Sequence, residues 1–233
     1  MIDSETPRAE QAATRTVDAG TASAPGRPLV VIADDHQDMR EALADLLESV
    51  GIDTLSFENA RELLEAELPD RPGCFVLDVR MPGISGLDLQ AQLSQREHAM
   101  PIIFITGHAD VPMSIKAMKA GASDFLTKPV REQELLDAVW TAIDADRSRR
   151  IEQTVVSENV SRYDTLSRRE RQVLSFVAQG HLNKQIAYEL GVSEVTIKLH
   201  RGAVMKKMAA GSVAELARMW DALPALIRLK DPG

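Results

Sequence analysis

The chain has 233 residues, of which 44% are hydrophobic and 27% are charged, and its formal net charge is −8 at pH 7. This length suffices for two modest domains, and no apolar stretch reaches the roughly 18 residues of a membrane helix, which excludes a membrane-spanning protein. The single cysteine, Cys74, lies in an apolar run and the N-terminus lacks a secretory signal, so we expect a cytoplasmic protein without disulfides.

Charge is distributed unevenly along the chain. Residues 162–233 contain 12 Lys/Arg and 7 Asp/Glu, whereas residues 1–161 contain 15 Lys/Arg and 28 Asp/Glu. An acidic first part suits cation binding and protein contacts, and a basic second part is the electrostatic footprint of a nucleic-acid-binding domain. We therefore expect the two parts to have different partners.

Residues 1–27 are rich in Ala, Thr, Ser, Pro and Gly and show no apolar periodicity, which predicts a disordered tail. This tail is either a regulatory arm or a segment without a role, and its sequence favours neither.

From Leu29 onward, short apolar runs alternate with amphipathic stretches, which is the pattern of a parallel sheet covered by helices on both faces. The predicted strands are 29–33, 52–56, 74–78, 102–106 and 124–127. The predicted helices are 37–50, 59–67, 86–97, 112–120 and 131–145. The fold class expected for residues 28–145 is therefore α/β, with a doubly wound five-stranded parallel sheet.

Polar side chains stand where four of these strands end. Asp34 and Asp35 follow the first strand, Asp78 ends the third, Thr106 ends the fourth and Lys128 follows the fifth. Each of these residues alone would be read as a turn, cap or surface residue. Together at one edge of a parallel sheet, they predict an acidic pocket for a hard cation, with a hydroxyl donor and a fixed positive charge beside it.

Apolar residues recur every four positions between Leu135 and Ile143 and again, past a charged stretch, at Ile151 and Val155. This narrow seam favours a helix with a coiled-coil-like surface. A flexible charged linker is the alternative for residues 146–160, and the sequence leaves both open. We assign residues 146–161 to a helical linker.

The remaining residues, 162–233, carry the signals of a smaller all-α domain. Ser167 and Glu170 form a capping box at the start of a helix. A short helix over 183–190, a turn containing glycine, and a second helix over 194–208 then make a helix-turn-helix pattern.

Within this pattern, apolar and polar residues have different expected roles. The expected core residues are Ile186, Ala187, Leu190, Val192, Val195, Ile197 and Val204. The candidate DNA contacts are Asn183, Lys184, Thr196, Lys198, His200, Arg201 and Lys206. Lys and Arg can neutralise phosphates or donate to guanine in the major groove.

Two further expectations concern the last helix and the histidines. Residues 212–223 form an apolar face around Trp220, which predicts packing or dimerisation. The five histidines have no metal-ligand spacing and are predicted to be surface residues: His36, His98, His108, His181 and His200.

The order and spacing of Asp34-Asp35, Asp78, Thr106, Phe125 and Lys128-Pro129 resemble the receiver domain of two-component response regulators over about residues 28–146. The strings 166–170, 184–187 and 195–200 closely resemble the LuxR-type output domain, although Gly202 stands where relatives carry a basic residue. The whole chain thus resembles FixJ-like or StyR-like regulators.

The receiver resemblance implies roles for individual residues. Asp78 would accept a phosphoryl group from a sensor histidine kinase or from acetyl phosphate. Asp35, Asp78 and the backbone carbonyl of Arg80 would bind Mg²⁺, with Asp34 acting through a water. Lys128 and Thr106 would contact the phosphoryl oxygens, Phe125 would turn as Thr106 moves, and the Lys128-Pro129 peptide would be cis.

These roles imply a regulator and not an enzyme. The phosphorylated chain would form a homodimer, bind double-stranded promoter DNA and act on RNA polymerase, with activation favoured over repression. The alternatives are an enzyme of the aspartyl-phosphatase type and a DNA-binding protein that works without phosphorylation.

Overall fold

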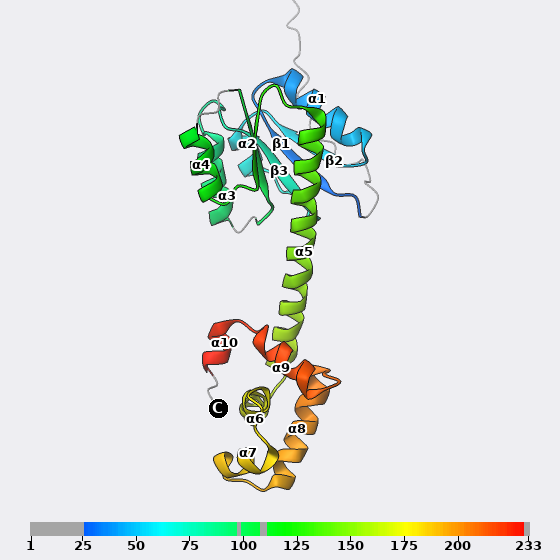
Figure 1. The fold of residues 1–233 in the computed structure, drawn as a ribbon, viewed down its shortest axis with the longest axis vertical. Helices are drawn as coiled ribbons and strands as arrows, with labels where there is room; N and C mark the ends of the chain where they lie inside the picture. The colour runs from blue at the N-terminus through cyan, green and yellow to red at the C-terminus, as the bar shows by residue number, and fades with distance from the viewer. Residues whose placement is uncertain (1–25, 97–98, 108–110, 231–233) are drawn as a thin grey trace, which may run out of the picture. The chain divides into compact units, whose positions relative to one another are not determined.

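Residues 26–96, 99–107 and 111–230 are described from a computed structural model, in which the chain forms two compact units, Met1–Ile143 and Asp144–Gly233 (Figure 1). The first unit alternates strands and helices, and the second is helical in its described part. None of the described helices has both the length and the apolar composition needed to cross a membrane. The tail predicted at residues 1–27 lies almost wholly outside the described residues.

The first unit contains the strands and helices that the apolar pattern predicts. Its strands are β1 (Leu29–Ala33), β2 (Asp53–Phe57), β3 (Gly73–Asp78), β4 (Ile102–Thr106) and β5 (Asp124–Thr127). Its helices are α1 (Gln37–Ser49), α2 (Ala60–Glu65), α3 (Gly86–Gln95), α4 (Val111–Lys119) and the first part of α5 (Glu132–Asp164). Several bounds differ from the prediction by one or two residues, because helix and strand ends carry weaker local signals than their centres.

The five strands form one parallel sheet in the order β2-β1-β3-β4-β5, which confirms the predicted doubly wound fold. In its register, Ala33 lies beside Leu77 and Asp78 lies beside Ile105. Because all strands run in the same direction, the polar residues that end β1, β3, β4 and β5 gather at one edge of the sheet.

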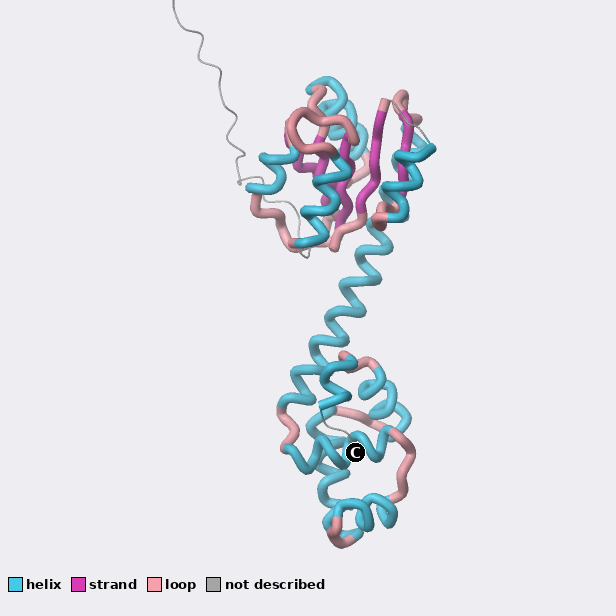
Figure 2. Tube along the Cα trace, turned by 90° about the vertical axis from the view of Figure 1, so that its left-hand side faces the viewer, coloured by secondary structure: helices cyan, strands magenta, loops and turns pink. Residues whose placement is uncertain are grey.

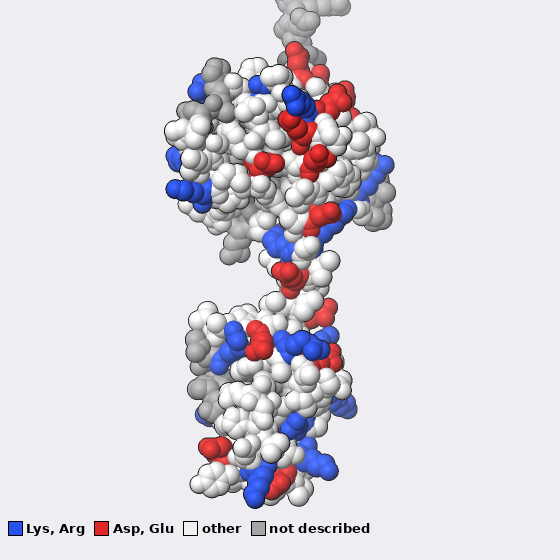
Figure 3. Space-filling model, in the orientation of Figure 1, with Lys and Arg blue, Asp and Glu red and all other residues white. Residues whose placement is uncertain are grey.

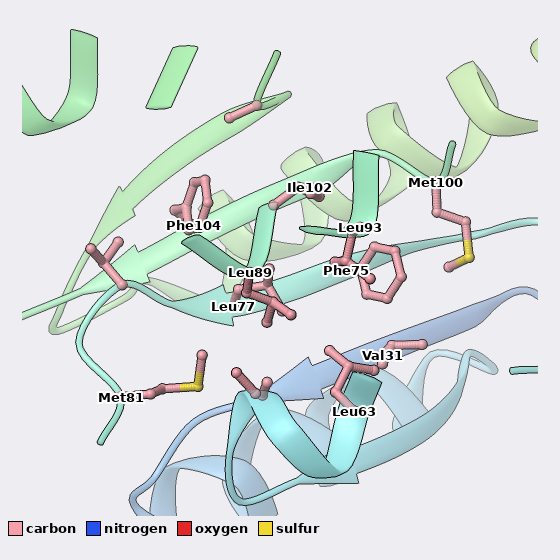
Figure 4. Close-up of a cluster of buried hydrophobic side chains, with 14 of the residues drawn as sticks. Val31, Leu63, Phe75, Leu77, Met81, Leu89, Leu93, Met100, Ile102 and Phe104 are labelled. Atoms are coloured by element: carbon pink, nitrogen blue, oxygen red, sulfur yellow. The ribbon is translucent and has the colours of Figure 1, made fainter. Parts of the chain in front are cut away.

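Helices cover both faces of this sheet (Figure 2). One face packs against α2, α3 and α4, with Phe75, Leu89 and Phe104 in its core (Figure 4). The other face packs against α1 and α5 and contains Leu47 and Cys74. The strands β1, β3 and β4 are buried on both faces and therefore need apolar residues at nearly every position, which explains their continuous apolar runs in the sequence. Cys74 is a buried free thiol, in keeping with the predicted core role.

The helix α5 continues without a break through the stretch that the sequence left open between a helix and a flexible linker. It contains neither Gly nor Pro, and its charges pair along its own surface. Arg147 pairs with Asp144 at 3.1 Å, Arg150 pairs with Asp146 at 2.7 Å, and Arg149 also pairs with Asp146. Ion pairs at these spacings stabilise a helix, so the charged stretch supports α5 instead of ending it.

The second unit consists of the end of α5 and five further helices. These are α6 (Arg168–Ala178), α7 (Asn183–Leu190), α8 (Glu194–Met208), α9 (Val213–Asp221) and α10 (Ala225–Lys230). Its buried core includes Tyr163, Val173, Ile197 and Trp220. The predicted last helix corresponds to α9, and its apolar face packs within this core; α10 was not predicted.

The predicted capping box of Ser167 and Glu170 begins α6. Glu170 also accepts a hydrogen bond from Lys207 Nζ on α8, over 2.7 Å. This bond from Lys207 and the bonds from Ser167 hold the pKa of Glu170 below its ordinary value, against the opposing effect of burial. A single carboxylate therefore caps α6 and joins it to α8.

One expected core residue of this unit is wrong. Val195 is 70% exposed, whereas Ile197 and Val204 on the same helix are fully buried. Two residues correspond to a rotation of about 200° around a helix, so Val195 and Ile197 cannot share a face. Leu190 and Val192 are partly buried against the core.

Candidate functional site

The sheet edge brings together two buried carboxylates and an ammonium group that lie far apart in the sequence. Asp34 is 2% exposed and Asp78 is 5% exposed. Lys128, which follows β5, donates from Nζ to Asp34 Oδ2 and to Asp78 Oδ2, and each distance is 2.6 Å. The predicted meeting of these three residues is thus present in the structure.

The two carboxylates change the proton affinity of Lys128. Burial disfavours the charged ammonium, but the hydrogen bonds and charges of Asp34 and Asp78 act in the opposite direction and prevail, so the pKa of Lys128 is raised above its ordinary value. Lys128 therefore keeps a positive charge at neutral pH. A fixed charge in this position can stabilise negative oxygens that enter the pocket.

Backbone groups of the adjoining loops hold the carboxylates in place. Arg80 N donates to Asp78 Oδ1 over 2.9 Å, and His36 N donates to Asp34 Oδ1 over 2.9 Å. Gly86, at the start of α3, lies so near Asp78 that an added Cβ would be 2.3 Å from the Asp78 carbonyl oxygen. This close approach requires glycine, and it fixes the loop that follows the central strand.

Oxygen atoms at this edge are suited to hold a divalent cation. Ligand atoms of Asp34, Asp35, His36 and Asp78 all lie within 4.8 Å of one another. Asp35 Oδ1 is buried and makes no hydrogen bond within the described part of the chain, and its neighbour is His36 Nδ1, which lies 2.8 Å away as an ion-pair contact. Carboxylate oxygens are the ligands that a hard divalent cation prefers. The residues present therefore fit Mg²⁺ in their donor chemistry.

The pocket is open to solvent and has a volume of about 560 Å³. Its lining consists of His36, Asp38, Met39, Asp78, Arg80, Gly107 and Lys128. Asp78 and Lys128 both line this opening.

The remaining predicted residues of this site lie beside it. Thr106 is fully buried at the end of β4, next to Ile105, which pairs with Asp78. Phe125 is partly buried, and the centroid of its ring lies 6.3 Å from that of Phe104. The Lys128-Pro129 peptide is cis, as the resemblance implied.

The second unit presents a separate surface, the outer face of α8. Exposed residues recur there at spacings of three and four, which places them on one side of the helix: Val195, Lys198, Leu199, Gly202 and Lys206. Lys and Arg side chains gather over this edge of the unit, whereas acidic side chains gather beside α1 in the first unit (Figure 3). A basic exposed helix preceded by a short helix and a turn is the arrangement that enters a DNA groove.

The other candidate DNA contacts are not on this outer face. Arg201 is half-buried and bonds to Asn183 on α7, and Thr196 bonds to the capping Ser193 of α8. His200 is half-buried, and Lys184 is exposed on α7.

Three residues that the structure places at these two sites were not predicted from the sequence to belong to them. His36 lies at the acidic pocket, and the exposed apolar Val195 and Leu199 lie on the outer face of α8. His36 directly follows Asp34-Asp35, and this adjacency was the available signal. For Leu199, the signal was its helical spacing from Val195.

Known proteins resemble both units. Residues 30–140 match the family described as "Response regulator receiver domain", and residues 164–220 match "Bacterial regulatory proteins, luxR family". Nodulation protein W of Bradyrhizobium diazoefficiens is 50% identical over 204 residues, which cover 88% of this chain and 90% of that protein. Transcriptional regulatory protein FixJ of Azorhizobium caulinodans is 44% identical over 190 residues, which cover 82% of this chain and 90% of that protein. A solved structure of the response regulator StyR matches with a TM-score of 0.76 and 43% identity, over 84% of this chain and 99% of that chain.

Proposed function

The chain belongs to the two-component response regulators that join a receiver domain to a LuxR-type DNA-binding domain, and from this premise we propose that phosphorylation of Asp78 controls its binding to promoter DNA. Membership of this family implies a sensor kinase as partner and DNA as target, and it is a class of transcriptional regulators without enzymatic activity. The resemblance found in the sequence is thereby confirmed, and the aspartyl-phosphatase alternative is set aside.

The observation that carries the proposal is the position of Lys128 between Asp34 and Asp78. Lys128 Nζ lies 2.6 Å from Asp78 Oδ2, so a phosphoryl group on that carboxylate would meet a fixed positive charge. The buried Thr106 hydroxyl ends the neighbouring strand and can bond another phosphoryl oxygen. These groups act by position and charge on a group whose negative charge is spread over its oxygens.

A divalent cation completes this electrostatic arrangement. Asp35, Asp78 and the carbonyl of Arg80 would hold Mg²⁺, and Asp34 would act through a water. When bound, the ion offsets the charge on the transferred phosphoryl oxygens. The clustering of ligand atoms of Asp34, Asp35 and Asp78 within 4.8 Å of one another supports this assignment.

Phosphorylation would act on the second unit by promoting a homodimer. Thr106 would move toward the phosphate and Phe125 would turn into the space that it leaves, which biases the neighbouring surface between two states. Val111, Ile115 and Met118 on α4 are 70%, 48% and 47% exposed and recur at helical spacing. An apolar stripe of this kind on α4 supports an interface with a second copy.

The DNA-bound dimer would place the outer face of α8 in the major groove. Lys198 would donate to base edges, Lys206 would neutralise a phosphate, and the exposed Leu199 could contact a thymine methyl group. At a promoter, the bound regulator would act on RNA polymerase and activate transcription.

The decisive experiment measures phosphate uptake from radiolabelled acetyl phosphate with Mg²⁺ present. We expect Asp78→Asn to abolish labelling, because no other carboxylate projects from the central strand toward Lys128. The matched control is Asp45→Asn, which removes an exposed carboxylate on α1 and should label normally. Full labelling of the Asp78 variant would refute the assignment, and labelling of neither wild type nor variant would favour a regulator that works without phosphorylation.

A further inference from the structure

We infer that Gly202 sets how closely α8 approaches the bases of DNA, because the helix backbone lies directly against the major groove where this residue has no side chain. The inference rests on the proposed placement of the outer face of α8 in that groove. It adds to the proposed DNA contacts a positioning residue whose contribution is space for the DNA.

The local structure of α8 does not require glycine at this position. Gly202 lies in the interior of the helix, its φ is outside the left-handed region, and an added Cβ would meet no atom within 4 Å. Glycine in the interior of an exposed helix makes that helix less stable than alanine does, because glycine loses more conformational freedom on folding. An alanine would therefore fit here and would stabilise α8.

Gly86, the other glycine within a described helix, shows the contrast. There an added Cβ would lie 2.3 Å from the Asp78 carbonyl oxygen, so the fold itself excludes a side chain. At Gly202 the position is exposed and nothing in the described part of the chain excludes one. A glycine that no contact within the chain requires is expected where another molecule comes close to the backbone.

The residues around Gly202 indicate that this molecule is DNA. Along the outer face of α8, Gly202 lies about one turn after Leu199 and one turn before Lys206. Val195 and Leu199 are 70% and 71% exposed, and exposed apolar side chains that share a face favour burial against a partner. Lys and Arg side chains lie over this edge of the second unit (Figure 3), which selects a polyanion as that partner.

The size of the major groove explains what a missing side chain changes. The groove is about 12 Å wide, and a helix with its side chains is about 10–12 Å across, so the fit leaves little spare width. Without a side chain at Gly202, the axis of α8 can lie nearer the bases, which brings Lys198 and Leu199 toward the base edges. Because base edges carry the sequence information, Gly202 should affect the discrimination between sequences more than the affinity for any DNA.

The test measures the ratio of specific to random affinity of the full chain treated with acetyl phosphate and Mg²⁺. The specific probe is a duplex that the treated wild type enriches from a random-sequence pool, and the random probe is a scrambled duplex of the same length. We expect Gly202→Ala to lower this ratio by about tenfold, which is comparable with the loss of one base contact. The same variant should raise the melting temperature of the second unit by about 4–8 °C, because alanine favours the helix. A residue with only a structural role would not weaken specific binding while it stabilises the fold.

A second variant, Gly202→Lys, separates the effect of space from that of charge. The added cation should raise the affinity for random DNA and make the slope of log affinity against log salt steeper by about 1. The affinity for the specific duplex should nevertheless fall, because the new side chain holds α8 away from the bases. The matched control is Ala214→Lys, which adds the same side chain at an exposed position on α9 and should leave the ratio unchanged.

Two results would overturn the inference. One is a Gly202→Ala variant that melts at a higher temperature and keeps the ratio of the wild type; the other is a Gly202→Lys variant that binds the specific duplex more tightly than the wild type does. The wild type separates these failures from failure of the proposed function. Enrichment of a sequence by the wild type together with either result refutes the role of Gly202 alone, whereas a wild type that enriches no sequence refutes the proposed binding to promoter DNA and this inference with it.

Discussion

Arg201 on α8 donates from Nη1 to Oδ1 of Asn183, the first residue of α7, over 2.9 Å. Both residues were predicted to contact DNA, and the structure shows that they contact each other. A bond between the start of one helix and the middle of the next limits the angle between them. Arg201 and Asn183 therefore help to set how α8 is presented, whether or not either side chain also meets a phosphate.

We predict that the effects of Asn183→Ala and Arg201→Ala on DNA affinity are not additive. Each variant breaks the same hydrogen bond to a charged group, so the double variant should lose less than the two single losses together, with a coupling of about 0.5–3 kcal/mol. The measurement is a double-mutant cycle of binding to a promoter duplex. The control cycle combines Lys184→Ala with Arg201→Ala, because Lys184 is exposed. The losses of DNA affinity caused by these two substitutions should add. Additive losses in the first cycle would contradict a positioning role.

Lys198 and Lys206 should differ in what they recognise. Lys198 lies in the N-terminal half of α8, which enters the major groove in helix-turn-helix proteins, and Lys206 lies two turns later. Lys198→Ala should cost about 1–3 kcal/mol on the specific site and much less on random DNA. Lys206→Ala should weaken binding to both the specific site and random DNA, and it should make the slope of log affinity against log salt shallower by about 1. If Lys198→Ala lowers the affinity for both duplexes equally, Lys198 contacts only a phosphate.

Lys128→Met should destabilise the receiver in the presence of a chelator. The substitution keeps most of the aliphatic chain but leaves the buried carboxylates of Asp34 and Asp78 without their ammonium partner, which costs about 3 kcal/mol. Mg²⁺ should then raise the melting temperature of the variant more than that of the wild type, because the ion replaces the missing charge. Thermal melts with and without Mg²⁺ measure both effects. An unchanged melt in chelator would mean that the two carboxylates do not need Lys128.

Ile115→Glu should separate phosphorylation from dimerisation. Ile115 is 48% exposed on α4, so the substitution should leave folding and phosphate uptake intact while placing a charge in the proposed interface. The sedimentation coefficient of the wild type should rise on phosphorylation, and that of the variant should stay at the monomer value. Glu152, exposed on α5, offers the control Glu152→Gln, which should dimerise as the wild type does. Normal dimerisation of Ile115→Glu would move the interface elsewhere.

Trp220→Ala should destabilise the second unit without changing the oligomeric state. Trp220 is 8% exposed and its ring centroid lies 6.4 Å from that of Tyr163, so its removal should cost about 3–5 kcal/mol. The control is Leu226→Ala, because Leu226 is 75% exposed on α10 and should melt as the wild type does. Calorimetry of the full chain distinguishes the unfolding of the two units. If the unfolding transition of the second unit is unaltered in Trp220→Ala, the packing around Trp220 is not needed for stability.

Much of this protein follows from signals within a few residues of one another. The apolar pattern predicted all five strands of the sheet within one residue. For β1, β3 and β4, burial on both faces leaves little choice of residue at each position. The capping box at Ser167 and Glu170 likewise depends only on residues three apart. The shared sheet edge followed from the positions of Asp78, Thr106 and Lys128 at or just after the ends of predicted parallel strands, whereas the strand order was not predicted and is known only from the structure.

Tertiary structure alone decided the facts that depend on which side chains face each other across the fold. Val195 and Ile197 are equally apolar, but only Ile197 turns toward the core, since the direction of that core is set by α6 and α9. The bond from Arg201 to Asn183 depends on side-chain directions that residue spacing does not carry. Local sequence determines which segments become strands and helices, whereas their packing determines which polar atoms are brought within bonding distance.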